Sequence, residues 1–455
     1  MACNGLFGTG EPYDICPPNP NKYFTLKKAE LVVPNKPAWK VFYDLQVIYQ
    51  VSRDLPQDSV RAAQALYAAN KIVNTIKVED ETSLHDAAEI AKEFFGNKNG
   101  TSQHSLTAVG HCHIDTAWLW PYAETRRKIA RSWSSQLRLM EQHPEYVFVC
   151  SQAQQYEWLE QDYPSLFEEV KEKVKEGRFQ PIGGTWVEMD CNIPSGESFC
   201  RQFLLGQRFF REKFGYHSNV FWLPDTFGGL SRLSLSLLYY IILFLYLPQI
   251  IRESNMKYFF TQKLSWNNIN KFPLTTFHWI GLDGSKVLSH MAPSNTYNAR
   301  CMVSELIDSA KNHKDKMYSN ESLIVHGRLE GSSDCSVAIR GVGIGDGGGG
   351  PVPQYLERLD RMKDIVSGPY SGRGEGLPKV AYGSAESFYD RLERDSRDLA
   401  SWKGELYFEF HRGTYTTAAA VKRYNRKNEL LLRDLEQIAA VAGVVVDAGG
   451  YRYIW

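Results

Sequence analysis

The sequence has no net charge and no long basic run. Its 52 Lys and Arg residues balance 52 Asp and Glu residues, and charged residues make up 23% of the 455 positions. A nucleic-acid-binding protein normally gathers positive charge on one face or along one segment. We therefore expect no nucleic-acid partner. The 43% hydrophobic content is typical of a folded globular protein and excludes general disorder.

Closely spaced cysteine pairs are also absent. The eight cysteines are scattered, and no Cys-x-x-Cys pair occurs. Disulfide frameworks belong mainly to short secreted chains, and the opening residues MACNGLFGTGEPYD lack the basic and apolar regions of a secretory signal. We therefore expect reduced thiols and a cytoplasmic location.

Long apolar runs are missing, with one exception. Between Arg232 and Arg252 lie 19 uncharged residues, of which 15 are apolar. This length approaches the roughly 20 residues that span a bilayer. Pro248 and Gln249 interrupt the end of the run, and nothing else in the sequence indicates a membrane. A buried helix or strand, or an insertion, is favoured over a membrane anchor.

The hydrophobic periodicity changes along the chain. Up to about residue 95, apolar residues recur at helical spacing, for example Ala62, Leu66, Ala69, Val73 and Ile76. Short apolar runs then alternate with amphipathic segments, which predicts an α/β fold with a parallel sheet flanked by helices. The expected strands are 106–110, 146–151, 179–182, 219–223 and 258–262, with a hairpin at 276–290. One helix is expected to begin at Pro121, and four more are expected at 165–176, 198–214, 384–397 and 422–442.

The first candidate site follows the strand at 106–110, in Gly-His-Cys-His-Ile-Asp. If the strand continues through this segment, His111, His113 and Asp115 share one face. Imidazoles and carboxylates are ligands of zinc. The alternative is a strand end whose histidines only form hydrogen bonds.

Two aspartates form further candidates. Asp225 follows the strand at 219–223, where parallel sheets place their ligand crevice, although it would equally cap a turn. Asp346 is the carboxylate of the glycine-rich segment 341–351, which lacks the Gly-Lys-Ser/Thr of a P-loop. Glycines let a bulky ligand approach the backbone closely, and a flexible linker is the alternative.

Aromatic residues and one histidine complete the candidates. Trp118 and Trp186 follow expected strand ends, where an indole face can stack on a sugar ring, although most tryptophans are core residues. His411 precedes Gly413 and a hydroxyl-rich strip that contains Tyr415. A lone histidine is more often structural than a ligand.

These segments, in this order, resemble glycoside hydrolase family 38, the zinc-dependent α-mannosidases, and in particular its cytosolic branch. The resemblance runs from about Ala2 to Ala440 and rests on AVGHCHIDTAWLWP, CSQAQQYEWLE, GGTWVEMD, WLPDTFG, GDGGGGP and FHRGTYTT. It implies a retaining α-mannosidase that removes α-linked mannose from oligosaccharides. It also implies a Zn²⁺ cofactor, for which Co²⁺ is a candidate substitute.

The resemblance assigns roles to individual residues. It implies four zinc ligands, His113, Asp115, Asp225 and His411. Asp225 would also be the nucleophile and Asp346 the general acid/base. Trp118 would stack on the sugar, and Trp186 and Tyr415 would join the substrate site. His111 would then be a neighbour of the centre and not a ligand.

The resemblance also implies three regions. These are a helical lead-in (1–100), the catalytic α/β domain (101–400) and the start of a helical bundle (401–455). Segments 229–246 and 326–340 depart from the family pattern, so we expect insertions near Asp225 and Asp346. Because the bundle is expected to be truncated, the alternative function is that of an inactive fragment with residual metal or glycan binding. A homo-oligomer remains an open alternative to a monomer.

Overall fold

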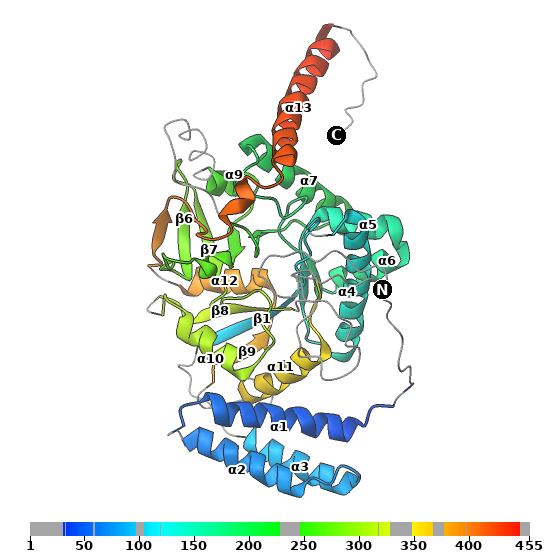
Figure 1. The fold of residues 1–455 in the computed structure, drawn as a ribbon, viewed down its shortest axis with the longest axis vertical. Helices are drawn as coiled ribbons and strands as arrows, with labels where there is room; N and C mark the ends of the chain where they lie inside the picture. The colour runs from blue at the N-terminus through cyan, green and yellow to red at the C-terminus, as the bar shows by residue number, and fades with distance from the viewer. Residues whose placement is uncertain are drawn as a thin grey trace.

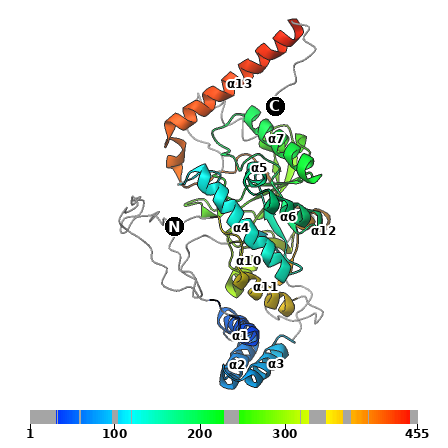
Figure 2. The same ribbon diagram turned by 90° about the vertical axis from the view of Figure 1, so that its right-hand side faces the viewer.

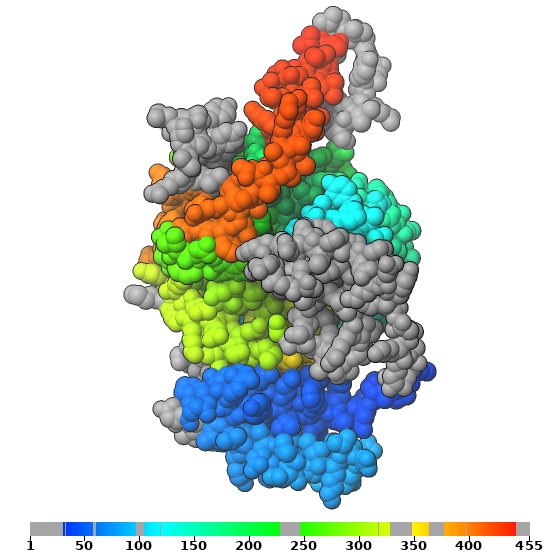
Figure 3. All heavy atoms as spheres, viewed as in Figure 1, coloured from blue at the N-terminus to red at the C-terminus, as the bar shows by residue number. Residues whose placement is uncertain are grey.

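The computed structural model describes most of the chain between residues 31 and 445. The helices α1, α2 and α3 lie at one end of the long axis, an α/β body lies in the middle, and the long helix α13 lies at the other end (Figures 1 and 3). The described residues are 31, 33–57, 60–96, 104–118, 120–227, 246–316, 318–327, 348–366, 377–396 and 398–445.

Helices α1, α2 and α3 pack against one another below the body (Figures 1 and 2). Asn35 begins α1 because its side-chain oxygen accepts a hydrogen bond from the Ala38 amide at 3.0 Å. Asp80 caps α3 in the same way through the Thr82 amide. The helices are α1 (Lys36–Asp54), α2 (Val60–Thr75) and α3 (Glu81–Phe94).

The predicted apolar face of α2 is partly wrong. Ala62 and Ala69 are buried, but Leu66 and Val73 are 59% and 57% exposed. The buried side of α2 is rotated towards smaller residues, and its members in the core shared with α1 and α3 are Ala62, Ala65, Ala68, Ala69 and Ile72. Small side chains let the three helices approach one another closely. The covered face of α2 is therefore the one with alanines and not the one with the largest apolar residues.

The first sheet has the order β3-β2-β1-β8, and β9 pairs with the first half of β1. Every pairing in it is parallel, as the alternation of strands and helices predicts. Its strands are β1 (Ser105–His111), β2 (Phe148–Cys150), β3 (Phe179–Pro181), β8 (Glu321–His326) and β9 (Lys379–Tyr382).

The second sheet has the order β10-β6-β7-β5-β4. The expected hairpin is present as the antiparallel pair β6–β7, and the other pairings are parallel. Its strands are β4 (Val220–Trp222), β5 (Tyr258–Thr261), β6 (Thr276–Ile280), β7 (Lys286–Met291) and β10 (Ser401–Lys403).

The two sheets meet where β3 approaches β4. The Gly183 amide donates to the Val220 carbonyl at 3.1 Å. The core between the sheets contains Val109 and Val149 of the first sheet and Trp222 and Phe260 of the second. At the strand ends, the Trp222 indole N–H donates to Nε2 of His111 at 3.2 Å. The carboxyl ends of β1 and β4 are therefore neighbours although they belong to different sheets.

Helices cover the sheets from outside. The helix expected from Pro121 is α4, and its inward face carries Ile129, Trp133, Leu137 and Met140, which are at most 3% exposed. The remaining helices are α4 (Tyr122–Gln142), α5 (Ala153–Asp162), α6 (Pro164–Lys175), α7 (Gly196–Phe214), α9 (Leu247–Glu253), α10 (Val303–Asn312), α11 (Pro353–Val366), α12 (Ala385–Asp395) and α13 (Ala419–Val445). Short 3₁₀ turns are η2 (Lys263–Trp266) and η3 (Arg412–Tyr415).

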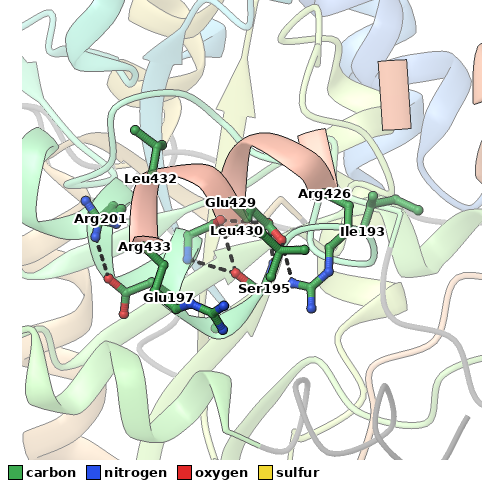
Figure 4. A pocket seen from close by; sticks show the side chains of 11 residues that line it. Ile193, Ser195, Glu197, Arg201, Arg426, Glu429, Leu430, Leu432 and Arg433 are labelled. Atoms are coloured by element: carbon green, nitrogen blue, oxygen red, sulfur yellow. Dashed lines mark hydrogen bonds and ion pairs between the residues drawn. The ribbon is translucent and has the colours of Figure 1, made fainter. Parts of the chain in front are cut away.

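Helix α13 extends away from the body and is attached at the N-terminus of α7 (Figures 2 and 4). The Glu429 carboxylate accepts from the Ser195 amide at 2.8 Å and the Ser198 hydroxyl at 2.7 Å. Arg201 of α7 pairs with Glu436 of α13 at 2.6 Å. A carboxylate at a helix N-terminus also interacts favourably with the helix dipole. These contacts hold the middle of α13 against the start of α7.

Most of the apolar run lies outside the described residues, as do 229–245 and 328–340 of the two expected insertions. The end of the run forms α9, whose Leu247 and Ile251 are buried in the core of the second sheet. Within the described ranges, no helix combines the length and the apolar composition needed to cross a bilayer.

Gly206 gives a test of this packing. A Cβ at position 206 would overlap the backbone of Thr185, so α7 could not keep its distance from the loop after β3. We expect Gly206→Ala to lower the free energy of unfolding by about 1–3 kcal/mol, despite the better helix propensity of alanine. Urea unfolding followed by circular dichroism measures this. Leu204→Ala on the exposed face of α7 is the control and should change stability by less than about 0.5 kcal/mol; equal effects would contradict the packing argument.

Candidate metal centre

Three of the predicted ligands lie together. His113 and Asp115 follow β1 of the first sheet, and Asp225 follows β4 of the second. One ligand atom from each of the three lies within 4.8 Å of the others. The close approach of the ends of β1 and β4 is therefore what assembles the group.

The distances within the group fit a tetrahedral metal ion. His113 Nε2 lies 3.5 Å from Asp115 Oδ1 and 3.4 Å from Asp225 Oδ2. Two atoms that bond the same zinc ion at about 2.0–2.2 Å with tetrahedral angles lie about 3.3–3.6 Å apart. Nε2 is also buried and has no partner with hydrogen-bond geometry in the part of the chain that the structure describes. The donor set therefore fits zinc in spacing and in chemistry.

Glu188 lies on the opposite edge of the same imidazole. Its Oε2 is 2.9 Å from His113 Nδ1, and the two side chains are only 6% and 7% exposed. The sequence did not indicate Glu188, although it lies in the segment GGTWVEMD, which forms part of the loop after β3.

Lys263 and Tyr297 hold Asp225. The Lys263 ammonium contacts Oδ1, and the Tyr297 hydroxyl donates to Oδ2 at 3.1 Å. Lys263 is buried, and its Nζ lies 3.9 Å from the centre of the Trp266 ring. The sequence analysis did not select Lys263 either. It lies just after the end of β5, the same kind of position that made Asp225 a candidate.

The charges of this group leave room for a divalent cation. With a neutral imidazole, the carboxylates of Asp115, Asp225 and Glu188 and the ammonium of Lys263 leave two negative charges uncompensated. Burial alone would lower the pKa of His113, but the facing carboxylates of Glu188 and Asp115 raise it well above its usual value. Burial alone would raise the pKa of Asp225, but His113 and Lys263 hold it well below its usual range. The shift of His113 reflects the carboxylates that face it, and the shift of Asp225 reflects its two cationic neighbours.

The alternation argument for His111 is wrong. Strand β1 ends at His111, so the residues that follow no longer alternate between the two faces of a strand. His111 is fully buried and accepts the Trp222 N–H, and it does not belong to the group of three. Burial holds its pKa well below the usual value. It is a neutral core histidine that joins the two sheets.

His411 lies near the centre but outside the group of three. It is exposed, has a left-handed backbone at φ 44°, and its ring centre is 5.4 Å from that of Phe227, two residues beyond Asp225. Burial and Lys263 lower its pKa, whereas the Asp225 carboxylate acts in the opposite direction. The charges of Lys263 and Asp225 therefore act on His411. Asp346 lies outside the described residues.

The candidate sugar-binding residues occupy different settings. Trp118 is 37% exposed, three residues beyond Asp115, and meets Trp120 edge-on at 5.2 Å between ring centres. Trp186 is half-buried, donates to Gln154 Oε1 at 3.1 Å and packs edge-on against Phe209.

Tyr415 belongs to the turn that follows His411. Its hydroxyl accepts from Asn192 Nδ2 at 3.2 Å, and burial raises its pKa. The contact ties the turn at 412–415 to the loop after β3.

Comparison with known proteins agrees with this architecture. Residues 103–405 match the N-terminal domain of glycosyl hydrolases family 38, and residues 409–455 match the α-mannosidase middle domain. The chain is 44% identical over 448 residues to "Alpha-mannosidase G" of Dictyostelium discoideum, covering 98% of this chain and 38% of that protein. It is 43% identical over 442 residues to "Alpha-mannosidase 2C1" of Homo sapiens, covering 97% and 39%.

The chain thus spans about two fifths of the length of the curated relatives that it matches. Among solved structures, an α-mannosidase from Enterococcus faecalis V583 is similar with a TM-score of 0.48 and 20% identity. The similarity covers 67% of this chain and 31% of that one.

A direct test of the centre is the binding of zinc. We expect the purified, metal-stripped chain to take up one equivalent of Zn²⁺ in equilibrium dialysis, and His113→Ala to lose that uptake because it removes the ligand that lies beside both Asp115 and Asp225. His85→Ala, which removes an exposed histidine on α3, is the control and should bind as the parent chain does. Equal uptake by the His113 variant would contradict the assignment.

Proposed function

The chain belongs to glycosyl hydrolase family 38, and on this premise we propose that it carries the metal centre of a zinc-dependent, retaining α-mannosidase acting on mannose-containing oligosaccharides. The observation that carries the proposal is the convergence of His113, Asp115 and Asp225 from two sheets within the matched residues 103–405. The α-mannosidase names of the curated relatives support the substrate class.

We assign four metal ligands in this proposal. The spacing of His113, Asp115 and Asp225 supports three of them, and the contact of the His411 ring with Phe227, two residues beyond Asp225, supports the fourth. Zn²⁺ is the proposed cofactor, with Co²⁺ as a substitute, because imidazole and carboxylate suit both ions. When bound, the ion would hold sugar hydroxyls beside Asp225 and favour the ionised form of that carboxylate.

Asp225 is the proposed nucleophile. In a retaining glycosidase one carboxylate attacks the anomeric carbon, while a second carboxyl group, typically about 5–5.5 Å away, protonates the leaving oxygen. Lys263 and Tyr297 fix the orientation of the Asp225 carboxylate and keep it ionised. We assign the general acid/base to Asp346.

The substrate site takes its proposed aromatic residues from three loops. The partly exposed indole of Trp118 provides a flat face for a mannose ring. Trp186 and Tyr415 would line the site from the loop after β3 and from the turn before α13.

The division into 1–100, 101–400 and 401–455 is part of the proposal. It is supported by the family match that begins at residue 103 and ends at residue 405. We propose a cytoplasmic location, in line with the scattered cysteines.

Replacement of the nucleophile tests the catalytic assignment. We expect Asp225→Asn to lower the release of dye from a chromogenic aryl α-mannoside by about 10³-fold or more, because the amide cannot form the glycosyl ester. Asp308→Asn, at an exposed position of α10, should retain parent activity. Near-parent turnover by Asp225→Asn would refute its role, and a parent chain that binds zinc without releasing dye would favour the non-catalytic glycan- or metal-binding alternative.

Removal of the metal tests the cofactor. Incubation with a chelator should abolish dye release, since the sugar would lose its oriented hydroxyls and Asp225 its neighbouring cation. Addition of Zn²⁺, and to a measurable degree Co²⁺, should restore activity. Hydrolysis that persists in the stripped protein, with metal content checked by mass spectrometry, would rule out the zinc mechanism.

A further inference from the structure

We propose that Glu188 is the positioning residue of the metal centre, holding the His113 imidazole so that Nε2 faces Asp115 and Asp225. The inference rests on the proposed function, because it concerns the same centre. Glu188 does not enter the assignment of ligands or of catalytic groups given above.

The imidazole ring divides its neighbours into two sets. Nε2 faces Asp115 and Asp225, at 3.5 and 3.4 Å, whereas Nδ1 faces Glu188 alone among these carboxylates, at 2.9 Å. The two ring nitrogens point away from each other, so one ion cannot bond both. Glu188 is accordingly outside the group of three. Nδ1 and Glu188 Oε2 lie within contact distance but without the angle of a hydrogen bond. With Nε2 on a metal ion, the ring proton would be on Nδ1, and a small turn of the ring would let it donate to Glu188, the usual arrangement of a metal-binding histidine and its supporting carboxylate.

The Glu188 carboxylate is itself held in place. The Ser151 hydroxyl donates to Oε1, which leaves Oε2 for His113. The Glu188 amide donates to Oε1 of Gln152 at 3.2 Å, so backbone and side chain are both fixed. The side chain is 6% exposed, and water has little access to compete for the carboxylate.

Gln152 extends this support to the loop that carries the ligands. Its Oε1 also accepts from the Thr116 hydroxyl at 2.6 Å, and its Nε2 donates to the Ile114 carbonyl at 2.8 Å. One amide therefore ties the loop after β1, between His113 and Asp115, to the segment of Glu188 after β3.

The backbone of Gln152 is in an unfavourable conformation. Its φ of 73° lies in the left-handed region, and the residue is 2% exposed. Such a conformation is unfavourable and persists only where its surroundings hold it, which is common at functional sites. Here the surroundings are the three hydrogen bonds to the loops of His113 and Glu188.

Zinc affinity is the readout that separates positioning from simple packing. We expect Glu188→Ala to weaken Zn²⁺ binding by about 10–100-fold, the range typical of lost supporting residues. Glu188→Gln should recover part of this loss, because its amide oxygen still accepts from Nδ1–H. Dissociation constants of the full chain are measured by competition with a chromogenic chelator. The visible absorption of the Co²⁺-loaded chain should shift in Glu188→Ala, since the ring is free to turn.

Ser151→Ala provides a second variant that leaves every ligand and Glu188 intact. It removes the hydroxyl that holds Oε1, and we expect zinc binding to weaken by a few-fold. The matched control is Glu305→Gln, which alters another mostly buried glutamate, one that accepts from the Arg300 and Met302 amides at the start of α10. The control should lower the melting temperature without changing zinc affinity.

The outcomes separate the two proposals. Parent-like zinc affinity and an unshifted Co²⁺ spectrum in folded Glu188→Ala and Ser151→Ala would overturn the positioning role and leave the metal centre standing. A parent chain that binds neither Zn²⁺ nor Co²⁺ would overturn the centre and this inference together. Loss of dye release alone, with unchanged metal affinity, would also count against the role of Glu188.

Discussion

The structure depends on the close approach of three carboxylates to one imidazole, two of them with little access to water. Asp115, Asp225 and Glu188 all face His113, and each has limited access to water. Like charges so close together repel strongly in a medium of low dielectric constant, so the arrangement needs cations that lie among them. Lys263 supplies one charge from the end of β5. The packing of the two sheets holds the three carboxylates close together in spite of their mutual repulsion.

Sequence reasoning located the parts of the centre that follow general rules of α/β folds. The alternation of strands and helices predicts parallel sheets, and the position after a strand makes Asp225 a candidate. Alternation of faces proposes His111, His113 and Asp115, and the family resemblance keeps only the last two as ligands. The alternation argument fails for His111, because side chains alternate between two faces only inside a strand, and β1 ends at that residue. Glu188 was not found, since a single glutamate in a loop carries no periodic signal. Its contact with His113 depends on how the ends of three strands are arranged in space.

The helical segments show the same limit. Apolar spacing predicts the existence of α2 and α13 correctly, but it does not reveal which side is covered. In α2 the covered side is the alanine-rich one, as two neighbouring helices require. In α13, Leu431, Leu435 and Ile438 are 62–67% exposed among the described residues. Periodicity records that a face is apolar, whereas the partner that covers it is a property of the tertiary structure.

The ligands of the centre come from strands of different sheets, and this has a consequence for cohesion. An ion shared by His113 and Asp225 bridges β1 and β4, whose sheets are otherwise joined by side-chain packing and by bonds such as Gly183 to Val220. Ligand binding stabilises a fold in proportion to the logarithm of free ligand concentration. The free metal concentration in the surroundings would thus contribute to the stability of the packing between the two sheets.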